Sequence, residues 1–289
     1  HDVHTTSLLG AMIILNELKS EWNGTIRCIF QAGEERLPGG ASLLIKEGVL
    51  KPNVSSIHGQ HVMPLIPAGK VGFRPGLYMA SADEIYIKVI GKGGHGAHPH
   101  MNIDPVVIAA EIISELQTVV SRHAKPSIPT VVSIGKVIAE GSTNIIPNEV
   151  YMEGTLRTYD EDWRMKAHQL IKTICRDKAK MHGAVCEVEV RKGYPFLLNN
   201  EDLTLKSRLW AEDFLGKDKV EELEIWPAGE DFAYYSQEIP ACFYRLGVRN
   251  EDEGITSMVH TPTFDIDESA LITGAGLMAW LAIKQISEQ

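Results

Sequence analysis

The sequence predicts an α/β protein whose main domain is interrupted by a smaller, inserted α+β domain. Helix and strand patterns alternate over residues 1–74 and again over residues 193–289, which is typical of an α/β layer with a largely parallel sheet. The stretch between them, residues 75–192, has the order strand, helix, strand, strand, helix, strand. That is the order of a ferredoxin-like split βαβ unit, so we expect the insertion to form a domain of its own.

The main domain is predicted from apolar spacing and turn residues. Residues 1–20 carry apolar side chains at helical spacing, and TIRCIF at residues 25–30 predicts a short buried strand that ends in QAGEE. Residues 39–47 predict a helix, and VSSIHGQHV predicts a strand that ends at a pair of histidines. After the insertion we expect a helix at 203–214, a strand at ACFYRLGV and a C-terminal helix from Glu268.

The insertion begins with ADEIYIKVI, whose alternating pattern predicts a half-exposed strand, and continues with the loop GKGGHGAHPHMN. A helix is expected next, with Asp104 as its cap and Pro105 at its first position. The remaining elements are expected to be strands at 130–137, 149–157 and 184–191 and a long helix at 160–182.

Composition and charge exclude several classes of protein. The formal net charge is −10, which argues against binding to nucleic acid. The sequence has no run of eighteen apolar residues, so no membrane span is expected. The four cysteines are widely spaced and form no C-x-x-C pair, which favours reduced thiols in a cytoplasmic protein. Because the chain does not begin with methionine, a preceding targeting segment is left open.

Two adjacent carboxylates, Glu34 and Glu35, follow the first predicted strand. In open α/β sheets, sites form beyond the carboxyl ends of strands, and two neighbouring carboxylates there repel each other unless a positive charge lies beside them. A metal ion supplies that charge, and one glutamate could bind it while the other acts as a general base. A solvated loop with two acids is the alternative, and this motif by itself favours the alternative.

Histidines strengthen the case for a metal site. Neutral imidazole is the commonest transition-metal ligand, although a single histidine at the end of a strand is more often a packed or surface residue. His123, His168 and His182 are predicted to be surface residues. The histidines at the ends of predicted elements are His1, His4, His58, His61 and His260.

The loop GKGGHG matches the dinucleotide-binding pattern G-x-G-x-x-G at Gly91, Gly93 and Gly96. In that fingerprint the third glycine already lies in a helix, whereas here the helix is expected only from Asp104. The glycines are better interpreted as a flexible loop that presents His95.

Eight motifs occur in an order that resembles a known group of amidohydrolases, the group that includes hippurate hydrolase, N-acyl-amino-acid aminoacylase and the plant auxin-conjugate hydrolases. The resemblance runs from His1 nearly to the C-terminus. The motifs are HDVHTT, FQAGEE, GQHVMP, RPGLYMASAD, GKGGHGAHPH, NIIPNEVYMEGTLRT, AGEDFAYY and VHTPTFDIDE.

The resemblance implies a site for two divalent cations, which could be Zn, Mn, Co or Ni. Its metal ligands would be His1, Glu35, His61 and His260. Glu34 would be the general base, and His95 would stabilise the oxyanion of the tetrahedral intermediate. Asn144 and Arg157 match positions expected to hold the carboxylate or amide of the substrate. Asp2 would orient a ligand histidine, His4 would either support a ligand or pack the helix, and Glu230 and Asp231 would lie near the substrate.

The family pattern has Cys-Gly before the histidine that stands here as His1. The resemblance therefore implies an N-terminally truncated, zinc-peptidase-like catalytic domain whose missing segment carries a metal-bridging cysteine. It also implies that the insertion is a lid and dimerisation domain, and that the partners are a second copy and a small N-acyl amino acid or peptide.

Three functions stay open on the sequence. The first is hydrolysis of hippurate-like N-acyl amino acids, and the second is a dipeptidase or aminopeptidase that uses the same two-metal site. The third is a non-catalytic dimerisation or binding fragment.

Overall fold

A computed structural model of the chain describes residues 1–288, and these fold into two compact units. Of the described residues, the first unit comprises His1–Tyr78, Leu198–Ile225 and 232–288, and the second comprises Met79–Leu197 and Trp226–Asp231. The sequence predicts an insertion at 75–192. The short segment Trp226–Asp231, which returns to the second unit, is not foreseen.

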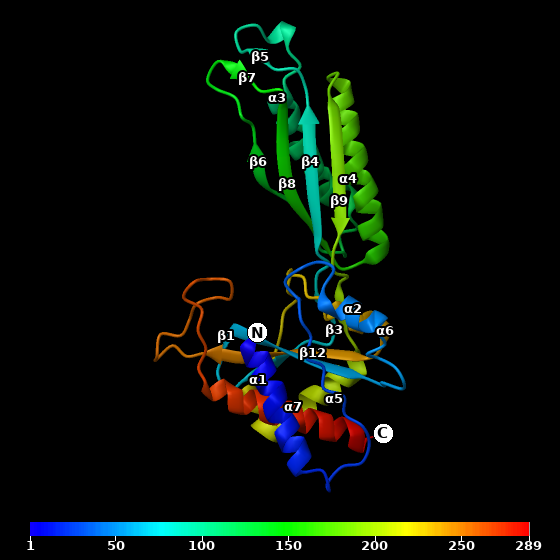
Figure 1. Ribbon diagram of the computed structural model, residues 1–289, viewed down its shortest axis with the longest axis vertical. Coiled ribbons are helices and arrows are strands. Elements are labelled where there is room, and N and C mark those ends of the chain that lie inside the picture. Colours follow the sequence, from blue (N-terminus) through cyan, green and yellow to red (C-terminus); the bar gives the residue numbers. More distant parts are fainter. Residues whose placement is uncertain (289) are drawn as a thin grey trace. The chain divides into compact units, whose positions relative to one another are not determined.

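The first unit is built on a four-stranded sheet with the order β1-β12-β2-β11 (Figure 1). The pairs β1–β12 and β2–β11 are parallel, whereas β2 and β12 are antiparallel, so the sheet is mixed. Its most apolar strand, β12, is buried along nearly its whole length, as expected for a strand covered on both faces. The strands are β1 (Ile57–Pro67), β2 (Val71–Phe73), β11 (Val220–Glu222) and β12 (Ala241–Arg249).

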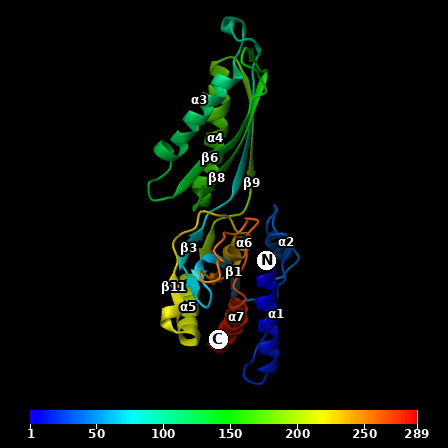
Figure 2. The same cartoon turned by 90° about the vertical axis from the view of Figure 1, so that its left-hand side faces the viewer.

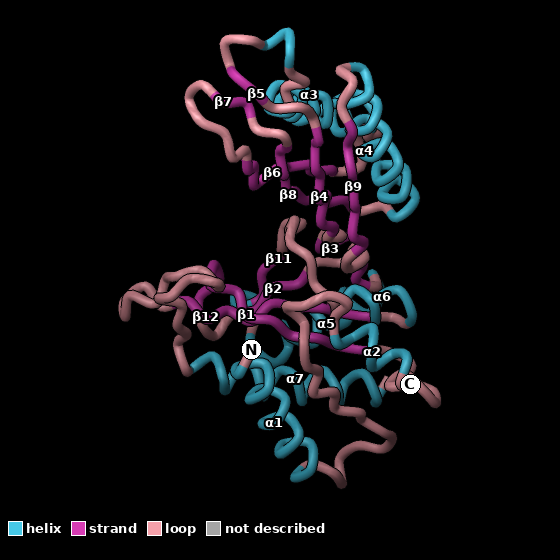
Figure 3. The backbone as a smooth tube through the Cα atoms, turned by 45° about the horizontal axis from the view of Figure 1, so that its top comes forward, coloured by secondary structure: helices cyan, strands magenta, loops and turns pink. Residues whose placement is uncertain are grey.

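Three long helices lie together on one face of this sheet, as Figure 3 shows. They bury apolar side chains such as Val3, Trp210 and Leu277 against Tyr244 and Leu246 of β12. These helices are α1 (Asp2–Glu17), α5 (Glu201–Leu215) and α7 (Ser269–Ser287). The first unit also contains the helices α2 (Gly40–Lys46) and α6 (Ala233–Glu238) and the 3₁₀ turn Lys217–Lys219.

Helix α7 is long and apolar enough to cross a membrane, and it is the single such helix among residues 1–288. Core helices of soluble proteins meet the same criteria, so this is weak evidence for a span. In this fold Leu277 and Leu281 of α7 pack against the sheet, and Ala279 packs against Ala11 of α1. The chain therefore uses α7 as a covering helix of the first unit.

The prediction of a buried strand at residues 25–30 is wrong. The structure describes these residues and gives them no regular secondary structure, and the side chain of Phe30 is 48% exposed. A strand exists only where a neighbouring strand takes up its hydrogen bonds, and local β-propensity cannot supply that neighbour. Glu34 and Glu35 consequently lie in a turn rather than at a strand end.

The second unit is an antiparallel four-stranded sheet with the order β6-β8-β4-β9 and two helices on one face (Figure 2). This is the strand order of the split βαβ unit that the sequence predicts. Its strands are β4 (Asp83–Ile90), β6 (Thr130–Ile138), β8 (Glu149–Thr158) and β9 (Val185–Lys192), and its helices are α3 (Pro105–Thr118) and α4 (Glu161–Met181).

The core of the second unit lies between the sheet and the helices. Ile85 and Ile87 of β4 pack with Ile112 of α3 and Ile171 of α4. Helix α3 begins as predicted, because the carboxylate of Asp104 accepts hydrogen bonds from two backbone N–H groups of the first turn. The minor elements of the chain are β3 (Gly76–Met79), β5 (Gly94–His95), β7 (Ile145–Ile146), β10 (Leu197–Asn199), the 3₁₀ turn Pro99–Met101 and the π turn Val119–His123.

A buried ionic network lies at the start of β4. Asp83 accepts hydrogen bonds from Arg164, from His168 at 2.6 Å and from the backbone N–H of Gly193 at 3.0 Å. The prediction that His168 is a surface residue is therefore wrong. Its place on the polar-looking helix does not disclose that Asp83, 85 residues earlier in the chain, is a buried partner.

Candidate metal centre

Four of the residues singled out in the sequence converge in the first unit. His1 precedes α1, Glu34 and Glu35 lie in the turn after the irregular segment 25–30, and His260 lies in the loop that follows β12. Nε2 of His1 is 3.8 Å from a carboxylate oxygen of Glu34 and 3.9 Å from Oε1 of Glu35. Nε2 of His260 is 3.7 Å from the same Oε1 of Glu35.

These distances suit shared coordination better than hydrogen bonding. They exceed the 2.7–3.2 Å of an ordinary N–H···O hydrogen bond. Two donor atoms that are each about 2.0–2.1 Å from one ion are at most about 4.2 Å apart. The carboxylate of Glu35 meets this condition with both His1 and His260. The donor set of imidazole and carboxylate is the set that Zn²⁺, Mn²⁺, Co²⁺ and Ni²⁺ accept.

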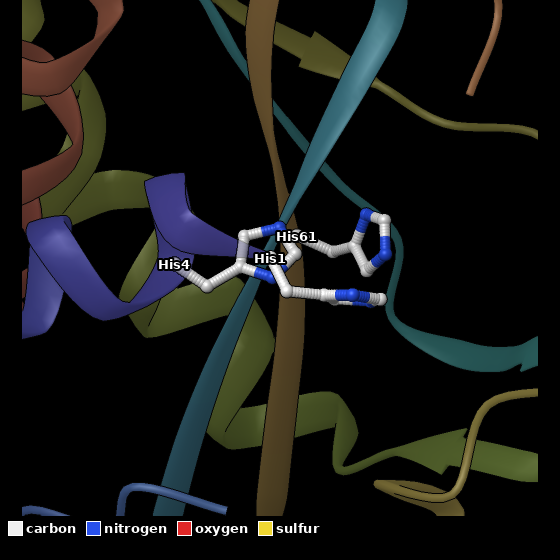
Figure 4. A group of neighbouring side chains, drawn as sticks. All are labelled: His1, His4 and His61. Atoms are coloured by element: carbon white, nitrogen blue, oxygen red, sulfur yellow. The ribbon is translucent and has the colours of Figure 1, made fainter. Parts of the chain in front are cut away.

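His61 extends this cluster from strand β1, and His4 lies beside it on the first turn of α1. Figure 4 shows the three imidazoles of His1, His4 and His61 gathered together. The ring centroids of His1 and His61 are 5.9 Å apart, and those of His4 and His61 are 4.4 Å apart. One ligand nitrogen from each of these three histidines lies within 4.8 Å of the others, so geometry alone also permits a three-histidine site.

Burial keeps His4 and His61 neutral at neutral pH. Burial lowers the pKa of His4 to about 4, with further contributions from the chain's N-terminal amino group and from Arg245. Burial also lowers the pKa of His61 well below 6.5, and the charge of Arg245 lowers it further. Since only the neutral imidazole binds a metal ion, His61 is ready to act as a ligand at neutral pH.

The sequence reasoning missed Arg245. It pairs in register with His61 across β1 and β12, and its side chain is 4% exposed. Its Nε donates a hydrogen bond of 2.7 Å to the hydroxyl of Tyr78, and its guanidinium lies over the ring of Phe243. The available signal was a charge inside the apolar run ACFYRLGV, because a charged residue in a buried strand needs a reason to be there.

His260 has a positive φ of 63°, which few residues other than glycine adopt. Such a backbone costs on the order of 1–3 kcal/mol and is concentrated at functional sites. Here it belongs to the residue that directs a ring nitrogen toward Glu35. The strained backbone is therefore a second, independent feature that marks this place.

His58 does not join the cluster, although it stands only three residues before His61. Successive side chains of a strand point to opposite faces, so residues 58 and 61 face opposite ways. Nε2 of His58 lies 2.9 Å from Oγ of Ser207 on helix α5, and burial lowers the pKa of His58 to about 4. Asp2 also stays outside the cluster, since its exposed carboxylate accepts from the backbone N–H of Val3.

His95 and Asn144 lie next to each other in the second unit. His95 ends β5 and pairs with Ile145 of β7, and the backbone N–H of Gly96 donates to the carbonyl oxygen of Asn144 at 2.8 Å. The side chain of His95 is exposed, and its Nδ1 accepts a hydrogen bond from the backbone N–H of Ala97. In the neutral ring the proton therefore lies on Nε2, which can act as a donor.

Arg157 lies at the other end of the same sheet. The register pairs Leu156 of β8 with Asp83 at the start of β4, whereas His95 follows the end of β4. The structure therefore does not bring Arg157 together with His95 and Asn144 within one chain. Burial lowers the pKa of Arg157, so burying this guanidinium carries a cost that an anion would offset.

Glu230 and Asp231 belong to the second unit and are buried.

Comparison with known proteins identifies the architecture. The model of Peptidase family M20/M25/M40 matches residues 1–284. N-acetylcysteine deacetylase of Bacillus subtilis (strain 168) is 38% identical over 285 residues, which are 98% of this chain and 72% of the relative. The IAA-amino acid hydrolase ILR1-like 2 of Arabidopsis thaliana is 36% identical over an alignment of 293 positions that covers 100% of this chain and 66% of the relative.

A solved structure agrees with these relatives. The crystal structure of the YxeP protein of Bacillus subtilis, described as a dinuclear metal binding peptidase from the M20 family, has a TM-score of 0.80 and 34% identity. The match covers 99% of this chain and 72% of that chain, and it extends over the mixed α/β fold described above. The chain therefore belongs to Peptidase family M20/M25/M40, and it is a metal-dependent hydrolase.

Proposed function

We propose that this chain hydrolyses the amide bond of N-acyl amino acids at a two-cation site formed by His1, Glu35, His61 and His260. The observation that carries the proposal is the position of Glu35, whose Oε1 lies 3.9 Å from one imidazole nitrogen and 3.7 Å from another. Two divalent cations, when bound, polarise the amide carbonyl and lower the pKa of water.

The roles of the two glutamates differ by geometry. Oε1 of Glu35 stands between His1 and His260, which is the position of a shared ligand. Glu34 turns a carboxylate oxygen toward His1 from a less exposed place, with its side chain 23% exposed against 53% for Glu35. We assign Glu34 as the general base, which takes a proton from the attacking water and passes it to the leaving amine.

The insertion is proposed to act as a lid and dimerisation domain. His95 would donate its Nε2–H to the oxyanion, and the neighbouring Asn144 would hold the amide or carboxylate of the substrate. Arg157 is a candidate for a carboxylate clamp, because a partly buried guanidinium favours a bidentate anion. Arg157 lies at the other end of the sheet from His95, which is compatible with the two residues serving different bound molecules in a dimer.

The substrate class rests on the relatives. One relative is named a deacetylase of N-acetylcysteine, and another is named a hydrolase of IAA-amino acids. Both names describe an acyl group joined to an amino acid. The alternative is a dipeptidase or aminopeptidase, and the solved structure that is described as a peptidase favours it.

The roles of the glutamates are tested with two matched variants, Glu34→Gln and Glu35→Gln. Hippurate turnover and bound metal are measured on the same purified protein. We expect Glu34→Gln to keep its metal and lose activity by about 10²–10⁴-fold, and Glu35→Gln to lose metal and activity together. Loss of metal in Glu34→Gln would mean that the two roles are exchanged.

The substrate class is tested by comparing hippurate, N-acetylcysteine and a plain dipeptide with the unmodified chain. Cleavage of the N-acyl amino acids in preference to the dipeptide supports the proposal. Cleavage of the dipeptide alone would overturn it in favour of a peptidase. A chain that binds metal and cleaves none of the three would favour the binding-fragment alternative.

A further inference from the structure

Two hydrogen bonds link His4 and His61 to the same residue of strand β1. The backbone N–H of Val62 donates a hydrogen bond of 3.0 Å to Nε2 of His4. The carbonyl oxygen of the same Val62 lies 2.9 Å from Nδ1 of His61. Both imidazoles therefore contact the backbone of Val62, His4 at its N–H and His61 at its C=O.

We propose that His4 is a positioning residue that fixes His61 through Val62, and that His4 is not itself a metal ligand. The inference rests on the proposed metal site and deepens it, because it separates the histidines that bind from those that support. His1, His4 and His61 have ligand nitrogens within 4.8 Å of one another, so a three-histidine site that includes His4 is the competing arrangement.

The hydrogen bond to His4 determines its tautomer. A backbone N–H can only donate, so Nε2 of His4 uses its lone pair as the acceptor. In a neutral imidazole the other ring nitrogen, Nδ1, then carries the proton. One nitrogen is occupied and the other is protonated, so neither is available to a cation while this bond is intact.

The same logic makes His61 a ligand through Nε2. A carbonyl oxygen can only accept, so Nδ1 of His61 carries the proton that it donates to Val62. Its Nε2 keeps a free lone pair for a cation. Metal-bound histidines are usually oriented in this way by a hydrogen bond from their second nitrogen to a carboxylate or carbonyl. His4 accepts from the backbone N–H of the residue that provides this carbonyl, and the centroid of its ring lies 4.4 Å from the ring centroid of His61.

The direct test is the tautomer of His4 in the unmodified chain. Long-range ¹H–¹⁵N NMR spectra at pH 7.5 distinguish a protonated Nδ1 from a protonated Nε2, and they are recorded before and after addition of Zn²⁺. We expect His4 to keep a protonated Nδ1 in both states, and Nε2 of His61 to shift when Zn²⁺ is added. A large Zn²⁺-dependent shift at either nitrogen of His4 would overturn the proposal.

Two variants give a second, independent readout. His4→Gln retains a side-chain oxygen that can accept from Val62, whereas His4→Leu removes the acceptor. We expect both variants to bind as many Zn²⁺ ions per chain as the parent. The affinity of His4→Leu should fall about 10–100-fold, and His4→Gln should recover most of that loss. His61→Gln is the control and should bind one ion fewer.

Failure of this inference can be distinguished from failure of the proposed function. If His4→Leu and His4→Gln each bind one ion fewer than the parent, His4 is a ligand and the inference is wrong while the metal site stands. If the parent binds no Zn²⁺, the proposed function fails. The NMR spectrum without metal then still tests the hydrogen bond from Val62 to His4, since a proton on Nε2 of His4 would contradict that bond.

Discussion

Each unit holds a carboxylate–histidine cluster, but the cluster around Asp83 is buried whereas the cluster around Glu35 is exposed. In the second unit, Asp83 receives donors from Arg164, His168 and Gly193, and the distances from His168 and Gly193 are 2.6 and 3.0 Å. In the first unit, the carboxylate of Glu35 faces His1 and His260 at 3.9 and 3.7 Å. The first arrangement is a set of hydrogen bonds within the protein, and the second has spacing that suits a cation between its members.

The hydrogen bonds of a carboxylate distinguish a structural cluster from a candidate metal-binding site. Both contain histidine and carboxylate at short range, and a search by residue type would select both. The network around Asp83 is complete in hydrogen-bonding terms, because both of its carboxylate oxygens accept donors. In the cluster around Glu35, one carboxylate oxygen instead lies 3.9 and 3.7 Å from two ring nitrogens, and one of these histidines has a positive φ. Three predictions test this distinction.

The largest effect is expected from breaking the network of the second unit. Asp83→Asn breaks the buried ion pair with Arg164, which keeps only the partly exposed carboxylate of Glu161, and breaking a buried pair costs about 3–5 kcal/mol of unfolding free energy. Urea unfolding measures the loss, and hydrogen exchange should locate it in α4 and β9. Glu84→Gln, at the exposed neighbouring position, is the matched control and should change stability by less than about 0.5 kcal/mol. Equal effects of both variants would contradict the structural role of Asp83.

A smaller effect is expected from adding metal. A ligand that binds only the folded state at one site stabilises it by about 2.7 kcal/mol when its concentration is one hundred times Kd. Zn²⁺ should therefore raise the unfolding free energy of the parent chain and of Asp83→Asn alike. Glu35→Gln should lose most of this gain. If Asp83→Asn loses the gain and Glu35→Gln keeps it, the two clusters have been assigned the wrong way round.

The third prediction concerns the stability of the metal-free chain as the pH is lowered. Burial lowers the pKa of His58 to about 4, so between pH 6.5 and 4 the unfolded state binds a proton that the folded state does not. Stability of the first unit is therefore lost as the pH falls through this range, by about 3 kcal/mol for His58. His58→Gln should flatten the pH dependence in that range.

The contribution of Asp83 to stability is lost at a lower pH than the contribution of His58. Burial by itself raises the pKa of Asp83, but hydrogen bonds from Arg164 and His168 outweigh burial and lower it to about 2. Its contribution is present above pH 3.8 and is lost only as the pH falls toward 2. Stability followed by hydrogen exchange in each unit should show the first unit weakening at the higher pH. Simultaneous loss in both units would contradict this order.

The sequence predicts those features whose signal is local. Helix α3 is predicted from Asp104 and Pro105, because a cap and a fixed φ act within one turn. The strand predicted at residues 25–30 is wrong, because a strand depends on a partner that the run itself does not contain. His168 was misassigned for a similar reason, since Asp83 is distant in the chain.

The residues of the candidate site also divide into those that motifs identify and those that only contacts in the fold identify. His1, Glu34, Glu35, His61 and His260 are singled out from motifs, and the fold brings them together in one unit. The sequence leaves two roles open for His4 and does not single out Arg245, because each of these residues is defined by contacts with strand β1 or β12. Residue type marks the atoms that can bind a metal. Only the fold shows which of those atoms are already engaged in hydrogen bonds.

The central claim is that Glu35, His1, His61 and His260 share a pair of divalent cations. Anomalous diffraction from crystals of the chain grown with Zn²⁺ tests it most directly. We predict Zn²⁺ peaks about 2.0–2.2 Å from the Glu35 carboxylate and from the three imidazole nitrogens. His4 should still accept its hydrogen bond from Val62. Peaks bound to His4, or peaks that avoid Glu35, would contradict the account.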